Sequence, residues 1–254
     1  MVDDRAELTH MSADASGLKR LALIPARGGS KRIPRKNIID FHGKPMLGYS
    51  VDAALESGLF DRVHVSSDDD EVREIAAKLG ADADPRRPAE LADDHTGILP
   101  VARWAVQEFA RQGQHFDDVF ILFACAPFIE AEELKQAYEV YLANDRKRNL
   151  LTVCRAPTHV EQYYRLNDQG QLNPLQKGGN FIRSQDLDYA YFETGTFTIF
   201  SAEWLTTHPT LMDDMNYVGF ELPEWKSVDI DSPKDLDYAR RLYGLHQSMA
   251  KESE

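Results

Sequence analysis

Residues 21–37 read Leu-Ala-Leu-Ile-Pro-Ala-Arg-Gly-Gly-Ser-Lys-Arg-Ile-Pro-Arg-Lys-Asn, a short apolar run followed by a loop rich in glycine and basic residues. Its apolar start, residues 21–24, is typical of a buried strand that stops at Pro25. The loop that follows combines small and cationic residues: Arg27, Gly28, Gly29, Ser30, Lys31, Arg32, Arg35 and Lys36. Close like charges repel unless an anion lies among them, and small residues let backbone N–H groups approach phosphate oxygens. The loop therefore predicts a phosphate site, with a solvated basic turn as the alternative. It matches neither the P-loop nor the dinucleotide-binding fingerprint.

The composition limits the class of protein. The 254 residues include 29 basic and 42 acidic side chains, a formal net charge of −13. That length suits one α/β domain with an embellishment, and the acidic balance argues against nucleic-acid and membrane partners. Residues 1–17 are polar, unlike a signal peptide, and are predicted to form a disordered extension. Cys125 and Cys154 lie in apolar runs without metal-ligand spacing, so we expect reduced thiols in a cytoplasmic protein.

Strand and helix patterns alternate along most of the chain. We expect strands at residues 21–24, 62–66, 119–124 and 150–154, and a helical pattern follows each of the first three. Pro45 is predicted to start the first helix and Gly58 to end it, and Asp68 is predicted to cap the second helix in a capping box with Glu71. This alternation is typical of a doubly wound, mostly parallel α/β sheet, in which ligands bind at the carboxyl ends of the strands.

The alternation breaks in residues 155–191. This stretch is polar and rich in turns, and we interpret it as a small β-rich insertion within a domain that spans residues 18–246. It has no evident partner strand in the main sheet, so we expect it to pair with its copy in a homodimer. Strands at residues 195–200 and 225–230 and a helix from Ser232 to Gly244 are predicted to follow, before a tail at residues 247–254.

Asp229 and Asp231 form the second chemical signal. On the predicted strand at 225–230 and its end, a spacing of two residues would direct both carboxylates to the same face. Such hard oxygen ligands suit Mg²⁺, which takes one or two protein carboxylates together with water and substrate phosphates. A solvated acidic pair is the alternative. Together with the phosphate loop, the pair predicts a magnesium site.

Three ordered motifs resemble the CMP-sialic acid synthetase family, the cytidylyltransferases that activate nonulosonic acids. Residues 24–38 are similar to the family's amino-terminal motif, and Arg-Pro-Ala-Glu-Leu at 87–91 and Ser-Val-Asp-Ile-Asp at 227–231 resemble its later motifs. The resemblance covers residues 20–243. It implies a Rossmann-like nucleotidyltransferase domain whose substrates are CTP and a nonulosonic acid, and whose insertion builds a dimer.

The resemblance also implies roles for particular residues. Arg27 and Lys36 would stabilise charge that develops on the triphosphate, and Asn37 would orient the nucleotide. The predicted nucleotide-binding residues are Arg27, Gly28, Gly29, Ser30, Lys36, Asn37, Arg87 and Thr96. The predicted sugar-binding residues are Phe123, Ala126, Arg165, Arg183, Gln185 and Glu193. In the family an arginine of the insertion reaches the neighbouring subunit's sugar site, where a guanidinium suits the sugar carboxylate; Arg183 matches it, and Arg165 is a second candidate. For both arginines an ordinary structural hairpin is the alternative.

The identity of the sugar depends on where the motifs differ. Many sialic acid members carry Gln-Pro-Thr-Ser-Pro where this chain has Phe-Ala-Cys-Ala-Pro at 123–127, so the glutamine that meets the sugar is replaced by Phe123. Ser-Lys-Arg-Ile-Pro, Asp-Asp-His-Thr-Gly, Ala-Pro-Phe and Arg-Ser-Gln-Asp-Leu look like the pseudaminic acid branch. Pseudaminic acid is therefore favoured, and legionaminic and N-acetylneuraminic acids stay open.

The hypothesis is an Mg²⁺-dependent cytidylyltransferase that transfers CMP from CTP to the anomeric hydroxyl of the sugar and releases pyrophosphate. Two alternative hypotheses for the function remain. One is a different enzyme on the same scaffold, a sugar-phosphate nucleotidyltransferase or a nucleotide-sugar glycosyltransferase. The other is a non-catalytic domain that binds anions.

Overall fold

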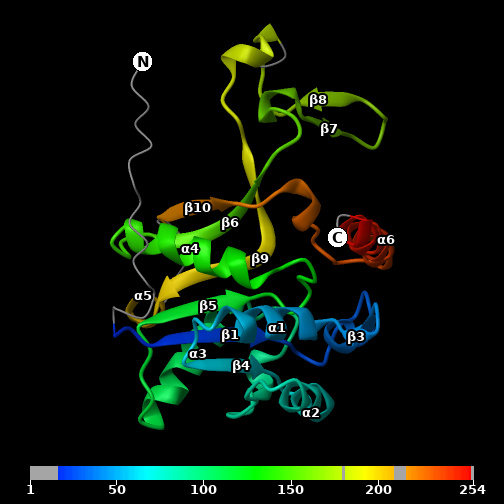
Figure 1. The fold of residues 1–254 in the computed structure, drawn as a ribbon. Helices are drawn as coiled ribbons and strands as arrows, with labels where there is room; N and C mark the ends of the chain where they lie inside the picture. Colours follow the sequence, from blue (N-terminus) through cyan, green and yellow to red (C-terminus); the bar gives the residue numbers. More distant parts are fainter. Residues whose placement is uncertain (1–16, 179–180, 209–215, 253–254) are drawn as a thin grey trace.

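A twisted six-stranded sheet lies at the centre of the protein (Figure 1). The computed structural model describes residues 17–178, 181–208 and 216–252, so nearly all of the predicted amino-terminal extension lies outside it. The strands, in sheet order, are β10 (Tyr217–Glu221), β6 (Asn149–Arg155), β9 (Tyr191–Ser201), β5 (Asp118–Leu122), β1 (Arg20–Pro25) and β4 (Arg62–Ser66). Only β9 runs antiparallel to its neighbours, and the other strand pairs are parallel. The predicted mostly parallel, doubly wound sheet is confirmed.

Helices cover both faces of this sheet (Figure 1). On one face α1 (Leu47–Ser57), α2 (Asp70–Lys78) and α4 (Ala131–Ala143) pack their apolar sides against the buried strands. On the other face lie α3 (Ile98–Arg111) and α5 (Ala202–Thr207). The last helix, α6 (Pro233–Glu252), packs beside the hairpin of β2 (Asp40–Phe41) and β3 (Lys44–Pro45) in a third apolar cluster. None of the described helices is both long and apolar enough to span a bilayer.

Two predicted helix starts are wrong by one or two residues. Pro45 belongs to β3, and α1 begins at Leu47. Asp69, not Asp68, caps α2 by accepting a hydrogen bond from the Val72 backbone N–H at 3.0 Å. Asp68 and Asp69 are adjacent, and the sequence alone does not show which of them caps the helix. In the structure the Asp68 carboxylate instead accepts a hydrogen bond from the Gly28 backbone N–H in the basic loop.

The carboxyl-terminal part differs more from the prediction. Residues 225–230 are not a strand: a short 3-10 turn (Glu224–Lys226) is followed by irregular chain, and the sixth strand is β10, which was not predicted. The final helix passes Gly244 and continues to Glu252, through most of the predicted tail. A glycine inside a helix costs only about 1 kcal/mol, and the ring of the preceding Tyr243 packs on Phe41 and Tyr49, so packing overrides the stop signal.

The predicted insertion rises from the end of β6 and returns at the start of β9, and it projects away from the helix-covered sheet (Figure 1). It contains a small antiparallel hairpin of β7 (Tyr164–Leu166) and β8 (Leu172–Pro174). Arg155 and Tyr191 face each other where the two legs leave the main sheet. Many large apolar side chains of this segment are exposed, Phe181 and Leu166 most of all, at 91% and 68%.

Candidate functional site

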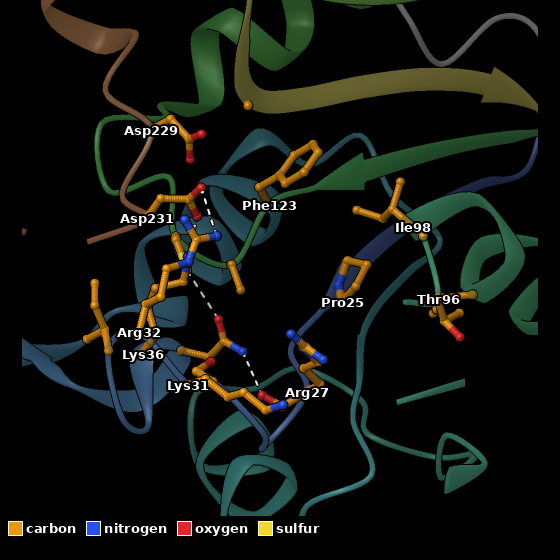
Figure 2. A pocket seen from close by; sticks show the side chains of 18 of the residues that line it. Pro25, Arg27, Lys31, Arg32, Lys36, Thr96, Ile98, Phe123, Asp229 and Asp231 are labelled. Carbon is orange, nitrogen blue, oxygen red and sulfur yellow. Dashed lines mark hydrogen bonds and ion pairs between the residues drawn. The ribbon is translucent and has the colours of Figure 1, made fainter. Parts of the chain in front are cut away.

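A cavity of about 560 Å³ opens at the carboxyl ends of β1 and β5, beside the start of β9 (Figure 2). Its walls come from the basic loop after β1, the loop before α3, the end of β5, and the irregular segment before α6. The lining residues include Arg27, Ser30, Lys31, Arg32, Lys36, Asn37, Arg87, Thr96, Phe123, Cys125, Glu193, Gly195, Asp229 and Asp231. The position agrees with the expectation for parallel α/β sheets.

On one side of the cavity, two cations of the basic loop, Arg27 and Lys31, form ion pairs with the loop before α3. The Arg27 guanidinium donates to the Asp94 carboxylate at 2.8 Å and to the backbone carbonyl of Asp93. Lys31 pairs with the same Asp94 carboxylate, and these two cations lower its pKa. The Asp93 carboxylate in turn accepts from the Thr96 backbone N–H at 2.6 Å. The basic loop and the loop that carries Thr96, a predicted nucleotide-binding residue, are therefore tied together by charge-assisted hydrogen bonds.

The opposite side is built around Lys36. Its ammonium donates to the Ile230 carbonyl at 2.6 Å and lies 3.4 Å from an Asp231 carboxylate oxygen. Arg32 pairs with the other Asp231 oxygen at 3.0 Å, as the dashed lines at the left of Figure 2 indicate. Lys36 thus connects the basic loop to the segment that carries the acidic pair, across a long stretch of sequence.

Asn37 lies between these two sides and fixes the loop. Its amide donates to the Arg27 carbonyl at 2.8 Å, and its carbonyl oxygen accepts from the Cys125 thiol at 3.2 Å. Burial raises the pKa of Cys125 to about 11, so the thiol stays protonated and able to donate. Cys125 lines the cavity as well as the core, a position that its apolar sequence context did not reveal.

Arg87 is almost fully buried, at 4% exposure, at the floor of the cavity. Its guanidinium donates to both the hydroxyl and the carbonyl of Ser66, at the end of β4. Desolvation lowers the pKa of Arg87 to about 10, yet the side chain is still cationic at neutral pH. No carboxylate of the described residues accepts a hydrogen bond from Arg87, and a buried cation in that situation favours an anion on its open side.

The small residues of the loop have different roles. Ser30 lines the cavity, whereas Gly28 and Gly29 are absent from its lining. The Gly28 backbone N–H donates to the Asp68 carboxylate at 3.1 Å, and a Cβ at Gly28 would lie 2.6 Å from an Asp69 oxygen. In this geometry the Gly28 N–H is used within the protein, and the glycine lets the loop pack against the start of α2. The role of Gly28 in nucleotide binding stays a prediction.

Asp229 and Asp231 both face the cavity although they do not lie on a strand. Partial burial, together with the charge of Asp231, raises the pKa of Asp229. Among the described residues, no side chain donates a hydrogen bond to Asp229, and no group of three or more His, Cys, Asp or Glu could hold a metal. A cation held by this pair would need further oxygen ligands. Mg²⁺ meets that condition, because it commonly takes only one or two carboxylates plus water and phosphate oxygens.

The predicted sugar-binding residues separate into two groups. Phe123 and Glu193 line the cavity, and Ala126 is buried just behind its wall. Arg165, Arg183 and Gln185 lie on the exposed insertion and do not reach the cavity of their own chain. Arg183 instead forms an ion pair with Asp186 at 2.7 Å, and its side chain is 72% exposed.

A cationic pocket with an acidic pair, at the carboxyl edge of a mostly parallel sheet, is typical of nucleotide-binding α/β enzymes. The chain belongs to the cytidylyltransferase family, whose sequence profile matches residues 21–254. It is 39% identical, over 92% of its length and the whole of the relative, to a pseudaminic acid cytidylyltransferase of Campylobacter jejuni. It is 28% identical, over 86% of its length and 52% of the relative, to an N-acylneuraminate cytidylyltransferase of Streptococcus agalactiae.

A solved structure supports the fold. A CMP:2-keto-3-deoxy-manno-octonic acid synthetase complexed with CTP superposes with a TM-score of 0.68 at 18% identity, over 90% of this chain and 99% of the other. At that identity the likeness concerns the arrangement of the sheet and helices. It agrees with the Rossmann-like nucleotidyltransferase fold implied by the sequence motifs.

Proposed function

We propose that this enzyme transfers CMP from CTP to the anomeric hydroxyl of a nonulosonic acid and releases pyrophosphate, with pseudaminic acid as its preferred acceptor. The observation that carries the proposal is the single cavity that joins a cationic loop to the Asp229 and Asp231 carboxylates. The similarity to pseudaminic acid and N-acylneuraminate cytidylyltransferases supports the chemistry.

The residues of the cavity suit an in-line displacement at the α-phosphorus of CTP. The attacking oxygen is the anomeric hydroxyl, and the leaving group is pyrophosphate. Arg27, Lys31 and Lys36 supply positive charge where negative charge develops on the leaving group, and the buried Arg87 adds a preorganised cation at the cavity floor. Asp229 and Asp231 would hold Mg²⁺, which when bound neutralises phosphate charge. Positioning and charge neutralisation account for most of such catalysis.

The preference for pseudaminic acid is inferred from the apolar wall of the cavity near Phe123. Pseudaminic acid ends in a methyl group where N-acetylneuraminic acid has a hydroxyl, and the ring of Phe123 suits a methyl better. A hydrophobic pocket rejects an added hydroxyl only about a hundredfold, so slower turnover of N-acetylneuraminic acid is compatible with the proposal. Legionaminic acid also ends in a methyl, and it is the main competitor.

A homodimer is part of the same proposal. The insertion exposes a row of large apolar side chains, among them Tyr164, Leu166, Leu172, Leu175, Phe181 and Ile182. Such a surface is unusual for a monomer and suits pairing with a second copy. In that arrangement Arg183 would serve the partner's sugar site, because its own cavity is out of reach.

The decisive experiment measures pyrophosphate release with each of the four nucleoside triphosphates, with and without nonulosonic acids, and with and without Mg²⁺. We expect release only when CTP, Mg²⁺ and a nonulosonic acid are all present, with the highest kcat/KM for pseudaminic acid. Release with another nucleotide and a sugar phosphate would instead identify a sugar-phosphate nucleotidyltransferase. A clear preference for N-acetylneuraminic acid would refute the argument from Phe123.

A further inference from the structure

Among the described residues, the segment that carries Asp229 and Asp231 has no partner strand in the sheet. The edge strand β10 ends at Glu221 and α6 begins at Pro233, and between them only one 3-10 turn interrupts irregular chain. Backbone hydrogen bonds of a strand cannot therefore fix the two carboxylates. Side-chain contacts on either side of them must do so.

The contacts after Asp229 are easily identified. Ile230 is fully buried, and its carbonyl accepts from Lys36 at 2.6 Å. The Asp235 carboxylate, in the first turn of α6, accepts from the Ser232 backbone N–H at 2.7 Å and from its hydroxyl at 2.8 Å. Asp231 itself is paired with Lys36 and Arg32. The carboxyl-terminal side of the segment is thus held by several independent groups.

On the other side of Asp229 the charged anchor is Lys226, three residues earlier. Its side chain is only 5% exposed, and its ammonium lies 2.8 Å from a Glu130 oxygen and also contacts Glu133. The ammonium lies 4.9 Å from the centre of the Trp225 ring. A buried ammonium is strongly unfavourable unless it is paired, and here two carboxylates compensate it. The geometry of this group is therefore tightly constrained.

The two glutamates lie at the start of α4, directly after the loop that lines the cavity, and do not line it themselves. Glu130 and Glu133 form the capping box at the start of α4, in which the Glu130 N–H donates to Glu133 at 2.9 Å. The loop that leads into this helix carries Phe123 and Cys125, both of which line the cavity. The Lys226 ammonium therefore bridges the β5–α4 loop, which would contact the sugar, and the segment with the acidic pair.

We infer that Lys226 is a positioning residue for Asp229: through Glu130 and Glu133 it fixes the distance between the acidic pair and the β5–α4 wall of the cavity. The inference rests on the proposed function only in taking Asp229 as a metal ligand. Asp229, unlike Asp231, has no described cation in ion-pair contact, so its position depends most on this anchor. The role differs from plain stabilisation, because it predicts a loss of metal affinity and not only of melting temperature.

The test compares Lys226→Met, Lys226→Arg and a matched control, Arg146→Met. Arg146 also forms a partly buried ion pair, in this case with the buried Asp118 carboxylate at 2.7 Å, but at the start of β5, away from the cavity. Mn²⁺ affinity is measured by electron paramagnetic resonance in the presence of CTP, and amide hydrogen exchange of residues 227–231 is followed without ligands. Glu130→Gln is a milder second variant, because Glu130 is 57% exposed.

We expect Lys226→Met to weaken Mn²⁺ binding by about tenfold to a hundredfold, the range typical when a group that orients a metal ligand is lost. Exchange of residues 227–231 should become faster, Lys226→Arg should restore most of both properties, and Glu130→Gln should show a smaller change in the same direction. Arg146→Met should lower the melting temperature with unchanged Mn²⁺ affinity.

Two results would overturn the inference: unchanged Mn²⁺ affinity and exchange in Lys226→Met, or an equal loss of Mn²⁺ affinity in Arg146→Met. Absence of Mn²⁺ binding by the unmodified protein would overturn it as well. None of these measurements uses the sugar. A failure of the proposed function would appear separately, as no release of pyrophosphate from CTP and any nonulosonic acid by the unmodified enzyme.

Discussion

Replacing Gly28 with alanine should damage the protein far more than the same change at the adjacent Gly29. A Cβ at Gly28 would lie 2.6 Å from an Asp69 carboxylate oxygen and 2.7 Å from the Asp69 Cβ, too close to be tolerated. Either the Asp69 side chain or the basic loop must move. Asp69 caps α2 and pairs with Arg35 at 2.6 Å, so both interactions are at risk. At Gly29, by contrast, no atom lies within 4 Å of the added Cβ.

The size of the effect follows from these contacts. Loss of a helix cap costs about 0.5–2 kcal/mol. The partly exposed Arg35 pair adds about 0.5 kcal/mol after allowance for solvent screening. For a chain of this size, a total of about 2 kcal/mol lowers the melting temperature by about 4–8 °C. Gly29→Ala should stay within about 0.5 kcal/mol of the unmodified protein.

The assay pairs thermal and urea denaturation of both variants with pyrophosphate release. Gly28→Ala should also lose activity, because the shifted loop carries Arg27. The reasoning would be refuted if Gly28→Ala and Gly29→Ala had the same melting temperature. It would equally be refuted if Gly28→Ala destabilised the Asp69→Gly variant, which lacks all of the clashing atoms, as much as it destabilises the unmodified protein.

Further predictions concern the acidic pair, acid stability and assembly. Asp229→Asn should lower kcat at least about a hundredfold with little change in melting temperature; normal Mg²⁺-dependent turnover would contradict the metal assignment. Burial lowers the pKa of His64 below its ordinary 6.5, so the unfolded chain binds the proton first and stability falls as the pH drops below that value. Between about pH 7 and pH 5, the free energy of unfolding of His64→Gln should therefore fall less than that of the unmodified protein. If urea titrations gave the same pH dependence of the free energy of unfolding for both proteins, the assignment to His64 would be wrong. Leu166→Asp should convert a dimer to monomers in light scattering, whereas Leu55→Asp, an exposed position on α1, should not; a monomeric unmodified protein would reject the dimer.

Sequence patterns predicted the fold well where local and tertiary preferences agree. The strand at residues 62–66 appears with the predicted limits, and Gly58 ends α1 in the left-handed conformation that glycine favours. The patterns failed where tertiary contacts decide. Leu55 fits the apolar spacing of α1 but is 44% exposed. Gly244 is passed by α6 because the rings of Tyr243 and His246, on either side of it, pack on Phe41 and Trp225. The edge strand β10 was missed, since its half-exposed residues carry only a weak alternating pattern.

Sequence patterns also identified only part of the candidate functional site. Spacing and charge identified Lys36, Asp229 and Asp231, and all three line one cavity although the strand expected to carry the acidic pair does not exist. No local pattern could show that Arg87 is buried with its guanidinium on Ser66. The same holds for Cys125, whose thiol donates to Asn37: its role depends on contacts between residues far apart in the chain.

The two legs of the insertion are neighbours where they leave the sheet. Arg155 is the ladder partner of Tyr191, and Cys154 that of Phe192. Residues 156–190 therefore begin and end at almost the same place, like a domain inserted between two adjacent points. Their length and sequence can change in evolution without altering any strand of the core, so the contacts of the proposed dimer can diverge while the main sheet stays constant. For the same reason, the whole insertion could be exchanged between relatives as one continuous segment of the gene.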